Sequence, residues 1–153
     1  MIKIYPCKVN EVEALQNLND EVFIDNAKYD TDLDLTWAKG EKGRKYFTEL
    51  LNNSEAFSVI ARDGEREVGY VAASQKNIDY RKSKYLEIEN MGVIPEYRSL
   101  GVGKMLMEEC FKWAKENGYQ KVFVNTYVAN KEAVQFYIKN GFEEIDISLE
   151  KNL

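Results

Sequence analysis

A short segment from Arg98 to Gly103 places two glycines directly before an amphipathic stretch and fits the pattern R-x-x-G-x-G. Gly101 and Gly103 carry no Cβ that could block a bound group. The first turn of a helix also presents unpartnered backbone N–H groups at the positive end of the helix dipole. Such a loop holds phosphate through its backbone and needs no particular side chain. The segment therefore predicts a pyrophosphate-binding loop.

Two other glycine loops do not fit these residues. The dinucleotide fingerprint requires a third glycine where Leu106 stands, and the P-loop requires serine or threonine where Met105 stands. On its own, R-x-x-G-x-G is a weak pattern, and a tight turn that opens a helix is the alternative. The strand-like run ending at Val93 before the loop, and the helical pattern after it, favour phosphate binding.

The chain contains no histidine, which excludes histidine-dependent triads and histidine-ligated zinc sites. Proton transfer must therefore use carboxylates, tyrosine, lysine, cysteine or water. Glu87 and Glu89 alternate with Leu86 and Ile88, so a strand would place both carboxylates on one face. Either glutamate is a candidate general base, and a solvated strand face is the alternative.

Tyr137 is the candidate general acid. It shares a predicted helix face with Ala133 and Phe136, so its phenol can point inward. A positioned phenol can donate a proton to a leaving group that develops negative charge. A tyrosine packed in the core with its hydroxyl satisfied is the alternative interpretation.

The apolar pattern that must position these residues predicts one α/β domain over residues 1–153. We expect a mixed, mostly antiparallel sheet flanked by about four helices, in the order β-α-α-β-β-β-α-β-α-β. The expected strands are Ile2–Pro6, Ala56–Arg62, Glu67–Ser74, Tyr85–Val93, Lys121–Val128 and Phe142–Glu150. The first expected helix opens with a capping box of Asn10 and Glu13, and the others are Gly43–Asn52, Val102–Asn117 and Lys131–Asn140. Residues 25–40 are acidic and aperiodic, which indicates a loop or a short helix.

The net charge of −5 is concentrated in residues 11–35, which hold eight carboxylates and one lysine. The sequence has no basic patch, so nucleic acid is not an expected partner. No run approaches the ~20 apolar residues of a membrane span, and the first residues lack the pattern of a secretion signal. We therefore expect a cytoplasmic protein that contacts no membrane, with Cys7 and Cys110 as reduced structural thiols. No metal site is expected.

Two motifs, in this order, resemble the GNAT superfamily of N-acetyltransferases. The stretch from Met91 to Gly103 is similar to the acetyl-CoA motif of that family, R/Q-x-x-G-x-G/A. The stretch from Asn130 to Phe142 is similar to N-x-x-A-x-x-F-Y-x-x-x-G-F. Two motifs separated by one strand are far more specific than either motif alone.

The resemblance covers residues 55–150 well and residues 1–54 only in their β-α-α layout. Family members often carry Gly and Lys where Ser99 and Leu100 stand. This departure is mild, because the backbone makes the phosphate contacts.

The resemblance implies that acetyl-CoA is the cosubstrate and that a primary amine attacks its thioester directly. It implies that Tyr137 acts on the leaving thiolate. It favours Glu87 as the base, and leaves Glu89 or a water chain open. Backbone groups of Met91 and Val93 would pair with the pantetheine arm, and an N–H near Val93 would serve the oxyanion. The implied cofactor-binding residues are Met91, Gly92, Val93, Arg98, Ser99, Leu100, Gly101, Val102, Gly103, Lys104, Asn130, Phe136 and Tyr137.

The acceptor is the least determined part of the hypothesis. In this family it binds the first helices and the loops above the sheet, which here contain Asp25, Asp30, Asp32, Asp34, Phe23, Tyr29 and Trp37. Carboxylates with aromatic neighbours suit a small cationic amine, and a solvated acidic face is the alternative. A peptide N-terminus or lysine as acceptor, a non-catalytic acyl-CoA sensor and a homodimer all stay open.

Overall fold

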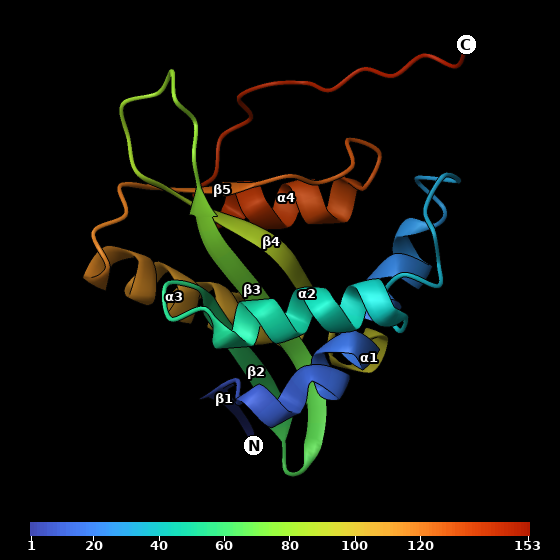
Figure 1. Cartoon of the computed structure of the whole chain (residues 1–153), viewed down its shortest axis with the longest axis vertical. Coiled ribbons are helices and arrows are strands. Elements are labelled where there is room, and N and C mark those ends of the chain that lie inside the picture. Colours follow the sequence, from blue (N-terminus) through green and yellow to red (C-terminus); the bar gives the residue numbers. More distant parts are fainter.

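The computed structural model describes residues 1–153, and its centre is one five-stranded sheet (Figure 1). In order across the sheet, the strands are β1 (Ile2–Pro6), β2 (Phe57–Asp63), β3 (Arg66–Lys76), β4 (Tyr85–Val93) and β5 (Lys121–Val124). Neighbouring strands are antiparallel except β4 and β5, which are parallel. The expected mixed, mostly antiparallel sheet is confirmed.

Helices lie on both faces of this sheet. They are α1 (Val12–Asn26), α2 (Glu41–Asn52), α3 (Val102–Glu116) and α4 (Lys131–Lys139), with short 3₁₀ turns η1 (Val9–Glu11) and η2 (Pro95–Tyr97). Figure 1 shows α1 and α2 on one face of the sheet and α3 on the other. No helix combines the length and the apolar character that crossing a bilayer requires.

Each face of the sheet carries its own apolar core. On one face, Leu106 of α3 packs with Val71 of β3. On the other face, Leu15 of α1 and Phe47 of α2 pack with Ile60 of β2. Because both faces are covered, a polar side chain on a central strand needs a partner or a path to solvent.

A β-bulge interrupts β4 at Glu89. Asn90 pairs with Ala72 and Ile88 pairs with Ala73, so Glu89 is an extra residue without a partner on β3. The pairing of β4 with β5 also stops at Ile88. A bulge bends its strand and increases the twist, so β4 separates from β5 beyond this residue.

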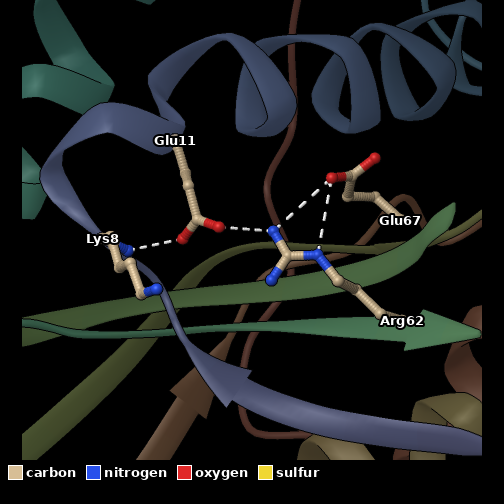
Figure 2. A network of polar contacts seen from close by, with 4 residues as sticks. All are labelled: Lys8, Glu11, Arg62 and Glu67. Atoms are coloured by element: carbon tan, nitrogen blue, oxygen red, sulfur yellow. Dashed lines mark hydrogen bonds and ion pairs between the residues drawn. The ribbon is translucent and has the colours of Figure 1, made fainter. Parts of the chain in front are cut away.

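Arg62 of β2 holds the start of α1 against the sheet. Its guanidinium forms an ion pair with Glu11 and a longer one with Glu67, 3.4 Å between Nε and Oε1 (Figure 2). Glu11 also accepts a 2.6 Å hydrogen bond from the backbone N–H of Lys8. The capping carboxylate therefore lies two residues before the predicted Glu13, because Arg62 fixes its position.

The last two expected strands differ from the structure. The strand expected over Lys121–Val128 ends at Val124, because the bulge takes its partner β4 away. The strand expected over Phe142–Glu150 is wrong: none of residues 143–153 makes a backbone hydrogen bond. Figure 1 shows this segment running clear of the sheet after α4. Its apolar alternation is not matched by pairing with any strand in this structure.

Candidate active site

The glycine loop enters α3 through two residues with positive φ. Gly101, the N-cap of α3, has φ 83°, and Ser99 has φ 61°. None of the backbone N–H groups from Ser99 to Lys104 donates to an acceptor within the protein. A Cβ built on Gly101 would meet no atom within 4 Å, so the space beside it is open. Consecutive free N–H groups at a helix N-terminus suit an anion.

The two sequence motifs meet at Gly103. A Cβ built there would lie 3.2 Å from the ring of Phe136 and 3.7 Å from Cε of Met91. The absence of a side chain at Gly103 therefore lets α4 approach the first turn of α3. Asn130 opens α4 as predicted, because its Oδ1 accepts a 3.1 Å hydrogen bond from the N–H of Ala133. The N-cap is confirmed, and the two motifs lie side by side.

The Arg98 side chain braces the loop from behind. Its Nε donates to the carbonyl of Val93 at 2.9 Å, and its guanidinium forms an ion pair with Asp25 at the end of α1. Arg98 thereby joins the end of β4, the loop and α1. Its side chain is committed to these protein contacts, which leaves the backbone N–H groups to face a ligand.

The other residues of the predicted cofactor set have different surroundings. Val102 is buried in the core under α3, and a Cβ on Gly92 would collide with Val22 of α1. Both residues therefore have packing roles. Leu100 is 60% exposed, and Lys104 forms an exposed pair with Glu108 at 3.7 Å. Of these side chains, only those of Leu100 and Lys104 are at the surface beside the loop.

Beyond the bulge, one edge of β4 has no strand partner. The N–H of Ile94 donates to the carbonyl of Val68 at 3.0 Å, which continues the pairing with β3. Alternation along an antiparallel pair then turns the N–H groups of Met91 and Val93 away from β3. These groups face the gap between β4 and β5, where an extended ligand can pair as an added strand.

Tyr137 lies between Phe136 and Phe142, with ring centroids 5.4 Å and 5.5 Å away in edge-on geometry. Burial raises the pKa of its phenol to about 12, and no protein group hydrogen-bonds to the hydroxyl. The phenol is therefore protonated at neutral pH and free to donate. Tyr137 also lines a groove of about 1100 Å³ along β5 and α4.

Glu87 and Glu89 both bond to side chains of β3, but to different kinds of partner. Glu87 is half-buried and its Oε2 lies 3.2 Å from Nζ of Lys76. Glu89 is exposed at the bulge, and its Oε2 accepts a 2.8 Å hydrogen bond from Oγ of Ser74. Glu87 therefore has a cationic partner, whereas Glu89 lies beside the hydroxyls of Ser74 and Tyr46.

A buried polar network connects the helices to the bulge. Nδ2 of Asn19 in α1 donates to the hydroxyl of Tyr70 at 2.8 Å and to Oδ1 of Asn90 at 3.1 Å. Nδ2 of Asn90 donates to the hydroxyl of Tyr46 at 3.1 Å. Burial raises the pKa of Tyr46, and the charge of Glu89 raises it further. The sequence patterns did not predict this network; the one signal of it is Asn19, an asparagine in the apolar stripe of α1.

The whole arrangement has a counterpart among known proteins. Residues 14–142 match the family described as the acetyltransferase (GNAT) family. The chain belongs to the GNAT family. The resemblance seen in the two sequence motifs is therefore confirmed.

Curated relatives resemble the chain in sequence, and solved structures share its fold. An uncharacterized N-acetyltransferase of Methanocaldococcus jannaschii is 30% identical over 72% of this chain and 50% of its own length. The chain thus spans about half the length of the curated relatives it matches. A Bacillus halodurans protein superposes with a TM-score of 0.86 at 18% identity, covering 99% of both chains. AAC(6')-Iy, solved with a bisubstrate analogue of CoA and neamine, superposes with a TM-score of 0.76 at 18% identity. The superposition covers 100% of this chain and 98% of that one.

The acidic segment of this GNAT chain is tied to the rest of the site by its own carboxylates. Asp25 pairs with Arg98, and Asp30 accepts a 2.6 Å hydrogen bond from the hydroxyl of Tyr127, just after β5. The bond from Tyr127 lowers the pKa of Asp30. Asp34 accepts from Thr36 within the segment. These carboxylates therefore hold the segment in place through contacts within the protein.

The predicted aromatic residues form two separate groups. Phe23 stacks on Trp37 at 5.6 Å, and Trp37 contacts Tyr46 at 5.7 Å. Tyr46, the last ring of this row, lies beside Glu89. Tyr29 instead stacks on Tyr127 at 6.2 Å, on the β5 side.

Proposed function

We propose that this GNAT protein transfers the acetyl group of acetyl-CoA to a primary amine. The observation that carries the proposal is the run of free backbone N–H groups from Ser99 to Lys104 at the start of α3. An anion with several oxygens, such as the pyrophosphate of CoA, matches this donor set. The unpaired N–H groups of Met91 and Val93 support a pantetheine arm laid along β4.

The acceptor amine must lose a proton before it can attack, because an alkyl ammonium has a pKa near ~10.4. We infer that Glu89 accepts this proton, directly or through water. Glu87 is paired with Lys76, whereas Glu89 is exposed at the bulge beside Tyr46, so the geometry supports Glu89 over the expected Glu87. Glu87 then contributes negative charge that helps to attract the ammonium form.

Tyr137 acts at the other end of the reaction. When the C–S bond of the tetrahedral intermediate breaks, negative charge develops on sulfur, and the protonated phenol of Tyr137 donates to it. The raised pKa of Tyr137 keeps this proton available throughout the physiological range. The backbone N–H of Val93, which faces the gap, is the proposed donor to the oxyanion.

We propose a small cationic amine as the acceptor class. The row of Phe23, Trp37 and Tyr46 ends beside Glu89, and aromatic faces next to carboxylates attract ammonium groups. AAC(6')-Iy, which shares the fold, is an aminoglycoside N-acetyltransferase. This likeness of fold supports the acceptor class, and the aromatic row of this chain is the independent argument.

A thiol-release assay over an amine panel tests both parts of the proposal. Spermidine, an aminoglycoside and a lysine peptide represent polycationic acceptors, whereas butylamine and glutamate are singly charged and acidic controls. We expect turnover with acetyl-CoA and a preference for a polycationic acceptor of about tenfold or more over butylamine. CoA binding without turnover of any amine would identify a sensor instead. Preference for glutamate would refute the acceptor class alone.

A further inference from the structure

The buried residues include two side-chain amides, Gln16 and Asn19, and both belong to α1. Gln16 donates to the carbonyls of Ala38 and Gly40 and thereby holds the segment that leads into α2. Asn19 is fully buried and instead joins the polar network that reaches the bulge of β4. Because a buried amide lowers stability unless its groups are hydrogen-bonded, the contacts of Asn19 need a reason.

The amide of Asn19 is held in one direction at a cost. Its Nδ2 donates both of its hydrogens, one to the hydroxyl of Tyr70 and one to Oδ1 of Asn90. Its Oδ1 is buried and accepts no hydrogen bond. A half-turn of this amide would set two acceptor oxygens, those of Asn19 and Asn90, against each other. The core therefore keeps an unpaired acceptor in order to present a donor to Asn90.

The amide of Asn90 has a fixed direction as well. Its Oδ1 is occupied by Asn19, so its Nδ2 is the group that faces the hydroxyl of Tyr46, at 3.1 Å. The Tyr46 oxygen thus serves as an acceptor toward Asn90, and its own proton is left for another partner. The carboxylate of Glu89 lies beside this hydroxyl. The donors of the network therefore follow one another from α1 toward Glu89, an arrangement in which each hydrogen bond strengthens the next.

Glu89 needs such support because the sheet does not supply it. As the extra residue of the bulge, Glu89 has no partner on β3, and its side chain is exposed. Oγ of Ser74 donates to one of its carboxylate oxygens, Oε2, at 2.8 Å. A carboxylate held by one hydroxyl can still turn about that bond. A second donor from another element, the hydroxyl of Tyr46 in α2, would fix its plane.

The neighbouring carboxylate does not compete for this donor. Glu87 also lies near Tyr46, but its Oε2 is 3.2 Å from Nζ of Lys76 and is already paired. Glu89 is therefore the carboxylate that is open to the Tyr46 proton.

We propose that Asn19 and Asn90 are positioning residues that aim the Tyr46 hydroxyl at Glu89 and so orient this carboxylate toward the acceptor amine. The inference rests on the proposed function, in which Glu89 is the base. Neither amide side chain bonds to Glu89, so both act through Tyr46. A base must lie within hydrogen-bond reach of the proton that it accepts, and a small misalignment lowers the rate of the chemical step more than it lowers substrate binding.

A double-mutant cycle on kcat tests the proposal, with the best acceptor of the amine panel. Asn19→Leu removes both donated bonds and suits the apolar stripe of α1, and it should lower kcat by ~10-fold with KM for the amine within ~2-fold. In a Glu89→Gln background the same substitution should lower kcat by less than ~2-fold, because the group that it positions is gone. Equal losses in both backgrounds would show that Asn19 only packs, and would overturn the proposal.

Gln16→Met is the matched control. It also removes two hydrogen bonds from a buried amide of α1, so it should lower the free energy of unfolding about as much as Asn19→Leu does. It does not touch the network, so kcat should stay at the wild-type value. An equal fall in kcat from Gln16→Met would assign the effect to stability alone and contradict the proposal.

Tyr46→Phe keeps the ring and removes only the hydroxyl, so it tests the last step even if Asn19→Leu does not fold. We expect the same ~10-fold fall in kcat, again absent in the Glu89→Gln background, and an unchanged kcat would overturn the proposal. The network itself is tested without turnover by NMR of the side-chain amides, where the Asn90 amide protons should exchange slowly with solvent. Fast exchange in the wild type would also overturn it. Wild-type kcat in Glu89→Gln would refute the proposed base together with this inference, whereas a large loss in Glu89→Gln with additive losses refutes this inference alone.

Discussion

The proposed donor half and the proposed acceptor half of the site are built in opposite ways. The proposed donor half consists of residues 91–104 and 130–137, and its free groups are backbone groups that glycines, a cap and a strand edge leave unpaired. The proposed acceptor half consists of Phe23, Trp37 and Tyr46 with Glu87 and Glu89, which are side chains from distant segments. Backbone recognition tolerates sequence change, whereas side-chain recognition sets specificity.

Two polar side-chain contacts link the acidic segment, which lies between Phe23 and Tyr46 in the sequence, to the donor side. Arg98 behind the donor loop pairs with Asp25 of α1, and Tyr127 after β5 donates to Asp30 of the acidic segment. Variants in one half should therefore leave binding in the other half largely unchanged, unless they break one of these contacts.

The largest expected effect tests the acceptor half. Glu89→Gln should lower kcat by ~100-fold or more, because the amide cannot accept the proton of the ammonium. Glu87→Gln is the matched control and should lower kcat less, since the Glu87 carboxylate is already paired with Lys76. CoA affinity, measured by titration calorimetry, should be the same in both variants. A greater loss from Glu87→Gln would assign the base to Glu87.

Tyr137→Phe tests the donor half through its pH dependence. We expect kcat to fall by roughly 100-fold with little change in the Kd of CoA, because the phenol acts on charge that develops only during C–S cleavage. The acid must be protonated, and its pKa is raised to about 12. The wild-type kcat should therefore not decline as pH rises from about 8 to about 10. A descending limb there that Tyr137→Phe removes would contradict this.

The sequence predicted much of the proposed donor half and little of the proposed acceptor half. The donor loop, the Asn130 cap and the strand β4 are encoded by neighbouring residues, so a local pattern was enough. The bulge at Glu89 and the network of Asn19, Asn90 and Tyr46 arise from register and packing between distant segments. The residue pattern within a single segment therefore cannot predict the bulge or the network.

The strand expected after α4 failed for a related reason. The alternation from Ile145 to Leu149 predicts a strand correctly as a local preference. A strand also needs a partner edge, and no residue of this segment pairs with the outer edge of β5. The local signal says nothing about such pairing.

Gly103→Ala should weaken CoA binding by about tenfold and leave the acceptor half unchanged. The new methyl group would press on the ring of Phe136 at 3.2 Å and displace α4 from the loop. We expect the Kd of CoA to rise by ~10-fold, while the preference among amines stays unchanged. The measurement is CoA titration together with the amine panel. A changed amine preference would show that the two halves are not independent.

Ser99→Gly has the smallest expected effect and isolates the backbone contribution. Ser99 has φ 61°, a conformation that costs a residue with a side chain ~1 kcal/mol and glycine almost nothing. Glycine also loses more entropy on folding, so the net gain in the free energy of unfolding should be about 0.5 kcal/mol. Leu100→Ala, at an exposed neighbour, is the control and should be near neutral. Because every N–H of the loop is kept, CoA affinity should not fall; a clear loss would mean that the serine hydroxyl, not the backbone, holds the phosphate.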